Sequence, residues 1–341
     1  MSISDMKPLS RRDLLARMGA FGLLGGAMAG GLPGWALAAG SADDLVIWGP
    51  PVGPSIALAH LVENSEIQNF APGATFKTWR TPDQLRAGMT SGKMKISVVP
   101  SYTGANLYNR GLPLRMLNIM TFGLLYMMSR DESVTSLDKI AGHTVVMPFK
   151  NDMPDLVFKH ITQKAGLVQG RDFKIQYVST PLEAVQFLLT KRATLAIIPE
   201  PAATAAQLKG LKNAVGVSRA FSLQDEWGKA TGRPPRIPQA GALVHEDLLE
   251  HKPDLVKAIQ TGSMASTEWV NNNPASAGRL AQDYLGLGAP VIEKSIPYSN
   301  LETKSAADTR EELEFFFSIL AEQSPAIIGG KMPEQRFYLA V

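Results

Sequence analysis

Four short segments of the 341-residue chain carry side chains suited to holding a small molecule, and each follows an apolar run. In parallel α/β sheets, ligands bind beyond the carboxyl ends of the strands, where helix N-termini present free N–H groups. We therefore expect ligand contacts at these corners. The candidate residues, with one further cation at position 80, are Trp48, Gly49, Pro50, Arg80, Ser101, Tyr102, Thr103, Phe149, Lys150, Asn151 and Glu200.

Each corner also has a purely structural interpretation. Ser101, Thr103 and Asp152 can cap a helix, because short polar side chains accept hydrogen bonds from its first free N–H groups. Lys150 can be a solvated loop cation. Trp48 can belong to the core. Glu200 follows an apolar strand and should be partly desolvated, so it needs a partner, either on the ligand or on a hinge residue.

Catalytic and metal-binding patterns are not found in the sequence. The five histidines do not form the spacings that place two ligands on one helix face. Nucleophile elbows, phosphate loops and dinucleotide fingerprints are also lacking, and the chain has no cysteine. The His245-Glu246-Asp247 run is most simply structural. The sequence thus predicts a protein without cofactor, metal site or catalytic residues, and not an enzyme.

The first 38 residues have the pattern of an export signal. Arg11 and Arg12 precede an uncharged, glycine-rich stretch that ends in Ala36-Leu37-Ala38, an A-x-A cleavage site. The arginine pair favours the Tat route into the periplasm. The alternative is a retained membrane anchor, but the glycines and Pro33 make a poor spanning helix.

Removal of residues 1–38 would take away four basic and two acidic residues and lower the formal net charge from +3 to +1. A nearly neutral chain does not fit a general binder of nucleic acid or anionic membranes. About 300 residues remain, which is room for two domains.

The remaining chain alternates apolar runs with helical patterns, which predicts an α/β fold with mainly parallel sheets. Two segments are built alike and are offset by 99 residues. In one, Thr81-Pro82 opens a helix that leads to an apolar strand ending at Pro100. In the other, Thr180-Pro181 opens a helix that leads to a strand ending at Pro199. Two lobes of like construction would explain the offset. The pattern fails over residues 224–239, and within this segment we expect residues 233–238 to form an exposed, partly polyproline loop.

Three segments are distinctive: residues 85–99, residues 136–145 with Ser136-Leu137 and Gly142, and residues 193–201 with the Glu200-Pro201 pair. In these segments the chain resembles periplasmic substrate-binding proteins of ABC transporters in the nitrate, sulfonate, taurine and thiamine-precursor group. His143 stands where the family usually has lysine.

The resemblance implies a two-lobed, type II binding fold with two hinge crossings, near residues 121–125 and 217–239. Lobe 1 would comprise residues 39–122 and 238–341, lobe 2 residues 123–219, and residues 220–237 the return crossing. A monomeric receptor would then close its lobes on a small molecule and pass it to a membrane permease. The solute stays open: a sulfonate or nitrate needs cations, whereas an aromatic slot with Glu200 suits a heterocycle or amine. A periplasmic sensor or enzyme on the same scaffold is the alternative.

Overall fold

A computed structural model of the chain describes residues 45–341. The two arginines of the export signal and its cleavage site lie outside the described residues. No helix in the described part is long and apolar enough to cross a membrane.

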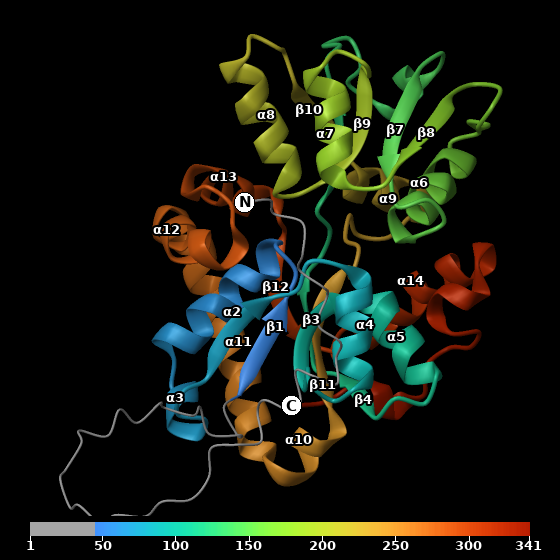
Figure 1. The fold of residues 1–341 in the computed structure, drawn as a ribbon. Helices are drawn as coiled ribbons and strands as arrows, with labels where there is room; N and C mark the ends of the chain where they lie inside the picture. The colour runs from blue at the N-terminus through green and yellow to red at the C-terminus, as the bar shows by residue number, and fades with distance from the viewer. Residues whose placement is uncertain (1–44) are drawn as a thin grey trace, which may run out of the picture. The chain divides into compact units, whose positions relative to one another are not determined.

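Two separate β-sheets organise the chain (Figure 1). The larger has the order β12-β5-β11-β3-β1-β2, with β4 paired to β11. Its strands are β1 (Val46–Gly49), β2 (Thr75–Thr78), β3 (Ile96–Pro100), β4 (Leu114–Met116), β5 (Asn118–Thr121), β11 (Ala240–His245) and β12 (Leu301–Ser305). We call this sheet and its helices lobe 1.

The smaller sheet has the order β10-β6-β9-β7-β8 and, with its helices, forms lobe 2. Its strands are β6 (Leu125–Ser129), β7 (Thr144–Pro148), β8 (Lys174–Val178), β9 (Leu195–Pro199) and β10 (Ser218–Ser222). Both sheets are mixed. Strands β2, β1 and β3 are parallel, as are β8, β7 and β9, whereas the strands next to the crossings pair antiparallel. The parallel pairing expected from the alternating pattern is therefore confined to the βαβ part of each lobe.

Helices cover both faces of each sheet (Figure 1). Helices α2, α11 and α12 share one core cluster with lobe 1, and α7 and α8 share another with lobe 2. A third cluster continues from the α4 and α5 side of lobe 1 to the α6 side of lobe 2. The helices are α2 (Gly53–Asn64), α3 (Ile67–Phe70), α4 (Pro82–Thr90), α5 (Ser101–Asn109), α6 (Met153–Lys164), α7 (Pro181–Leu189), α8 (Ala202–Lys212), α9 (Leu223–Thr231), α10 (Glu246–His251), α11 (Pro253–Asn272), α12 (Pro274–Leu285), α13 (Ala289–Ser295) and α14 (Arg310–Gln323).

The two repeated segments have the same structure, as the 99-residue offset predicts. Thr81 caps α4 by accepting a hydrogen bond from the backbone N–H of Gln84, and Thr180 caps α7 in the same way with Glu183. The Gln84 and Glu183 side chains each accept a backbone N–H from the residue before the cap. Both helices lead to a buried strand, β3 in lobe 1 and β9 in lobe 2.

The chain passes between the sheets twice. The first crossing is residues 122–124, between β5 and β6, and the second runs from β10 to β11. The second was predicted to be irregular from residue 224, which is wrong in part, because α9 occupies Leu223–Thr231. Trp227 on α9 is 2% exposed and packs edge-on against Phe315 and Phe316. This tertiary burial stabilises α9, whose helical pattern is hard to recognise in the sequence because prolines follow it closely.

Helix α14, near the C-terminus, links the two lobes through its contact with α6. Leu313, Phe316, Phe317 and Leu320 of α14 are fully buried, and their spacing of three, four and seven residues places them on one face of the helix. Burying side chains of this size contributes about 1.5–3 kcal/mol each. Farther along α14, the Gln323 amide donates to the carbonyl of Leu156 on α6 at 2.8 Å.

Candidate functional site

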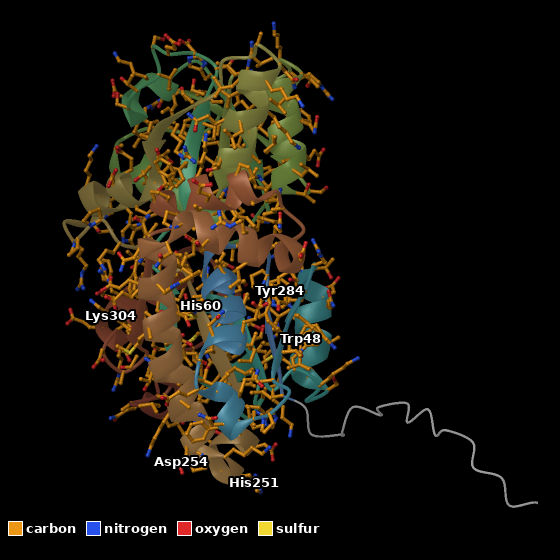
Figure 2. The ribbon with its side chains drawn as sticks, turned by 90° about the vertical axis from the view of Figure 1, so that its left-hand side faces the viewer. Trp48, His60, His251, Asp254, Tyr284 and Lys304 are labelled. Atoms are coloured by element: carbon orange, nitrogen blue, oxygen red, sulfur yellow. The ribbon has the colours of Figure 1, made fainter. Side chains whose placement is uncertain are left out.

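The first strand-end corner, after β1, folds back on itself. The Ser55 hydroxyl donates to the carbonyl of Pro50 at 2.5 Å, and a Cβ on Gly49 would overlap the Ser55 Oγ. Gly49 is therefore required by close packing in the corner. Trp48, which Figure 2 labels in lobe 1, is half-buried, and its Nε1 is buried without a hydrogen-bond partner. A buried donor of this kind is uncommon, because it loses its bond to water.

The corner after β3 contains Ser101, which is bonded within the protein, and Tyr102, which is partly open to solvent or a ligand. The Ser101 hydroxyl is fully buried and donates to the carbonyl of Pro238 at 2.6 Å, which ties the start of α5 to the return crossing. Thr103 is buried on the same helix. Tyr102 between them is half-buried. Burial raises the pKa of Tyr102 well above its ordinary value, and the nearby Asp152 carboxylate raises it further.

Asp152 belongs to lobe 2, and its carboxylate is near enough to Tyr102 of lobe 1 to raise the pKa of that residue. Asp152 caps α6, and its Oδ1 accepts from the backbone N–H of Met153 at 2.8 Å. The loop before it is tightly turned, with positive φ at Phe149 (65°) and Asn151 (58°). Asn151 and Lys150 are exposed, and the Lys150 ammonium lies 5.3 Å from the centre of the Tyr177 ring.

Glu200 lies after β9, and its partner is a residue of the protein itself. Its side chain is fully buried and forms an ion pair with Arg219 of β10. Oε1 accepts from the Arg219 Nε at 2.9 Å, and Oε2 accepts from the backbone N–H of Thr204 at 3.1 Å. Burial raises the pKa of Glu200, and the Arg219 guanidinium opposes that rise. Both carboxylate oxygens are thus engaged inside the protein.

Arg219 is the residue that sequence reasoning missed. Besides Glu200, it donates to Thr204 and to Gln207, and its guanidinium stacks 3.6 Å from the centre of the Tyr298 ring. Tyr298 ends the short 3-10 helix Ile296–Tyr298 in lobe 1. The Tyr126 hydroxyl of β6 donates to the carbonyl of Tyr298 at 2.8 Å. The Arg219 stack is therefore a second contact between the lobes.

Arg80 lies apart from these contacts. It is exposed at the end of edge strand β2, beside α12, where its Nη1 is 3.5 Å from the carbonyl of Leu285. The structure thus brings Tyr102 and Asp152 together, and Glu200 and Arg219 together. It does not bring Arg80 into either group.

The histidines have structural surroundings. His60, which Figure 2 labels, stacks on Trp269 with ring centres 4.0 Å apart. Burial lowers the pKa of His60. His245 caps α10 by accepting the backbone N–H of Asp247 at 3.2 Å, in agreement with its structural interpretation. Within residues 45–341, no group of three or more potential ligands could hold a metal ion.

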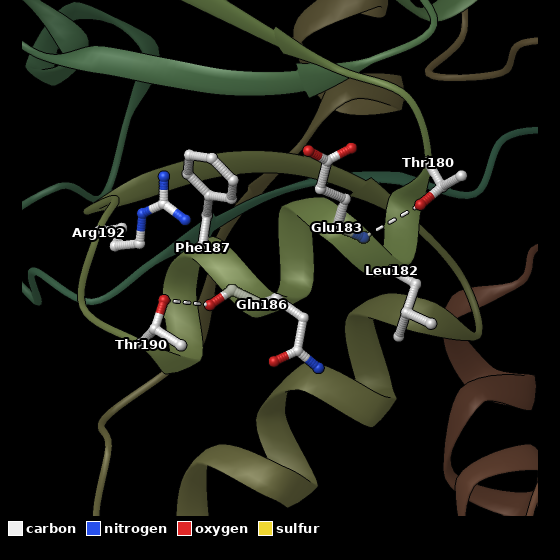
Figure 3. Close-up of a pocket in the computed structure, with 7 residues that line it drawn as sticks. All are labelled: Thr180, Leu182, Glu183, Gln186, Phe187, Thr190 and Arg192. Atoms are coloured by element: carbon white, nitrogen blue, oxygen red, sulfur yellow. Dashed lines mark hydrogen bonds between the residues drawn. The ribbon is translucent and has the colours of Figure 1, made fainter.

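A hollow of about 410 Å³ lies on lobe 2 beside α7 (Figure 3). Three of the polar side chains that line it, Thr180, Glu183 and Thr190, already have partners within the protein. The Thr180 and Thr190 hydroxyls take part in helix hydrogen bonds, and the Arg192 guanidinium lies 4.3 Å from the centre of the Phe187 ring. This hollow offers little unsatisfied chemistry to a polar ligand.

No protein-family model and no curated protein sequence matches the chain. Solved structures do match. An ABC transporter protein from Parabacteroides distasonis is 19% identical with a TM-score of 0.73, and the match covers 87% of this chain and 99% of that one. The chain has the fold of a periplasmic binding protein.

Two further structures with this fold have named ligands. The periplasmic aliphatic sulphonate binding protein SsuA from Escherichia coli is 15% identical, with a TM-score of 0.63 and coverage of 85% of this chain and 96% of that one. The periplasmic nitrate-binding protein NrtA from Synechocystis is 12% identical, with a TM-score of 0.61 and coverage of 83% and 82%. At these identities the likeness shows the two-lobed fold.

Proposed function

We propose that the chain is an extracytoplasmic solute-binding receptor that delivers a small organic or oxyanion solute to the permease of an ABC importer. The observation that carries the proposal is the architecture, in which two α/β lobes are joined by two crossings and each lobe has polar corners at the ends of its parallel strands. Ligands of open α/β sheets bind at this end of the strands. The printed roles of the structural neighbours, an ABC transporter protein, a sulphonate binder and a nitrate binder, support the same role.

In this proposal the two crossings are the hinge. Residues 39–122 and 238–341 move as lobe 1, and residues 123–219 move as lobe 2. The candidate contacts are those at the strand-end corners after β1, β3 and β7: Trp48, Gly49, Pro50, Tyr102, Thr103, Phe149, Lys150 and Asn151. Ser101 and Glu200 support these corners from behind, since their polar atoms are bonded within the protein.

We further propose that the receptor reaches the periplasm by the Tat route and acts as a monomer. Native mass spectrometry of protein isolated from the periplasmic fraction tests these points in one experiment. The expected result is a monomer that begins at Ala39 and carries a noncovalent small molecule. An Arg11→Lys, Arg12→Lys precursor should remain in the cytoplasm. An unprocessed protein, or a stable oligomer, would contradict the corresponding part of the proposal.

A further inference from the structure

Tyr298 of lobe 1 is held by two side chains of lobe 2. The carbon at the centre of the Arg219 guanidinium lies 3.6 Å from the centre of the Tyr298 ring, the distance of a stacked pair. The Tyr126 hydroxyl donates to the Tyr298 carbonyl at 2.8 Å, and the two tyrosine rings meet edge to face with centres 5.9 Å apart. Burial raises the pKa of Tyr126 to about 12, so its hydroxyl keeps its proton and remains a donor at neutral pH.

The partners of Arg219 within lobe 2 fix the orientation of its guanidinium group. Nε donates to Glu200 at 2.9 Å, Nη1 donates to Gln207 at 2.8 Å, and Nη2 donates to Thr204. Because donors of all three nitrogens at the edge of the planar group are used in lobe 2, its flat face is left for the Tyr298 ring. Arg219 is therefore positioned by lobe 2 alone, and the stack costs little further side-chain entropy.

The segment that carries Tyr298 is bound to the first crossing. The Asn300 amide donates to the carbonyl of Gly123 at 2.7 Å, and the Asn300 carbonyl accepts the N–H of Phe122 at 3.0 Å. Tyr298 thus belongs to a part of lobe 1 that is fixed to the crossing, whereas Arg219 moves with lobe 2. A rotation of lobe 2 about the crossing changes the position of Arg219 over the ring, so the stack depends on the angle between the lobes.

Two helices bring the lobes together at the same place. Helix α8 of lobe 2, which carries Thr204 and Gln207, packs against α13 of lobe 1, and α13 leads directly into the 3-10 helix that ends at Tyr298. Only 11% of the Arg219 side chain is exposed in this contact. A cation with few water neighbours is attracted more strongly to an aromatic face than a fully hydrated one. The stack therefore contributes to holding the lobes in contact.

We infer that Tyr298, stacked on Arg219, is a latch that stabilises the closed arrangement of the lobes, an inference that rests on the proposed receptor role. Part of the free energy of closure then comes from the protein itself, and the solute supplies the rest. The latch raises the fraction of closed molecules before any solute binds. A substitution at Tyr298 therefore lowers the apparent affinity for the solute through the equilibrium between open and closed lobes.

Distances between the lobes test the latch without any solute. The chain has no cysteine, so two introduced cysteines carry spin labels at chosen positions only. Gln282 of α12 in lobe 1 and Gln186 of α7 in lobe 2 are both exposed. Pulsed electron paramagnetic resonance on the Gln186→Cys, Gln282→Cys protein, freed of bound solute, gives the distribution of distances between the labels. We expect one component from closed molecules and a second, at a different distance, from open ones.

Tyr298→Leu, made in the labelled protein, removes the ring and keeps the backbone carbonyl that accepts from Tyr126. The ratio of closed to open molecules should fall about three- to tenfold, the scale of one partly exposed cation–aromatic contact. Tyr298→Phe is the matched control, because phenylalanine retains a ring for Arg219, and its distance distribution should stay close to that of the wild type. Tyr298 is 41% exposed, so both variants should fold, which circular dichroism checks.

The same distribution in the wild type and in Tyr298→Leu, or an equal shift in Tyr298→Phe, would overturn the latch. A wild-type protein with open molecules only would overturn it as well. The receptor role would stand in each of these cases, because the solute retained by the isolated protein tests that role. Protein that retains no solute and melts at the same temperature with every compound of a broad solute library would contradict the receptor role itself, and the distances between the lobes would still decide the latch.

Discussion

Replacing Arg219 by leucine should lower the free energy of unfolding by about 3–5 kcal/mol at neutral pH, because it leaves a buried carboxylate without its counter-charge. Glu200 is fully buried, and Thr204 supplies only neutral donors to it. The same change removes the stack on Tyr298 and therefore one contact between the lobes. Urea unfolding at fixed protein concentration measures the loss.

The sign of the pH dependence is a second readout of this pair. Burial already raises the pKa of Glu200 from its ordinary 4.5, and Arg219 limits the rise. Without Arg219, the folded-state pKa should lie higher still. A raised folded-state pKa gives stability that is present in acid and lost as the pH rises through that pKa. The variant should therefore be less destabilised at acidic pH, near 4.5, than at neutral pH.

A double variant, Arg219→Leu with Glu200→Leu, is the matched control. Replacing both members of a buried pair by apolar side chains is often close to neutral, so much of the lost stability should return. An Arg219→Leu protein as stable as the wild type, or one destabilised equally at both pH values, would contradict the assigned role of this pair.

Gly123→Ala should also be strongly destabilising, by about 2–5 kcal/mol, since backbone strain and overpacking add. Gly123 lies in the first crossing with φ of +117°, a conformation that residues with a Cβ rarely adopt. A Cβ there would overlap the side chain of Gln224 and lie 2.7 Å from its Cδ. Gln224 is buried and its Oε1 accepts from the Leu125 N–H, so it cannot withdraw without losing that bond.

Gly170→Ala is the control for backbone strain alone. Gly170 has φ of +90°, and a Cβ there would meet nothing within 4 Å. Its substitution should cost about 1–2 kcal/mol. If thermal or urea unfolding gave the same loss for both variants, the packing of Gln224 under the first crossing would not be the cause.

The sequence predicts the local structure well where local signals decide it. The segments that begin at Thr81 and Thr180 each contain a capping threonine, a proline and a glutamine or glutamate within four residues. Both helices begin where these residues predict.

Helix α9 also has local signals, because Ser222 caps it by accepting the backbone N–H of Asp225 and Gly232 ends it with positive φ. Gly228 and the following prolines weaken the helical pattern, and the burial of Trp227 against α14 adds tertiary support.

The candidate site was harder to predict because its partners are distant in the chain. Arg219 reaches Glu200 because β10 and β9 both pair with β6, an arrangement that no local pattern shows. Asp152 was recognised only as a cap, and its neighbour Tyr102 lies in the other lobe. The sequence could indicate the corners, but only the fold decides which corners meet and which charges neutralise each other.

Small-angle scattering with and without the solute identified by mass spectrometry tests the receptor account most directly. Two-lobed receptors close around their ligand by bending at the hinge. The account predicts a smaller radius of gyration on saturation. An unchanged radius of gyration at saturating solute would contradict it.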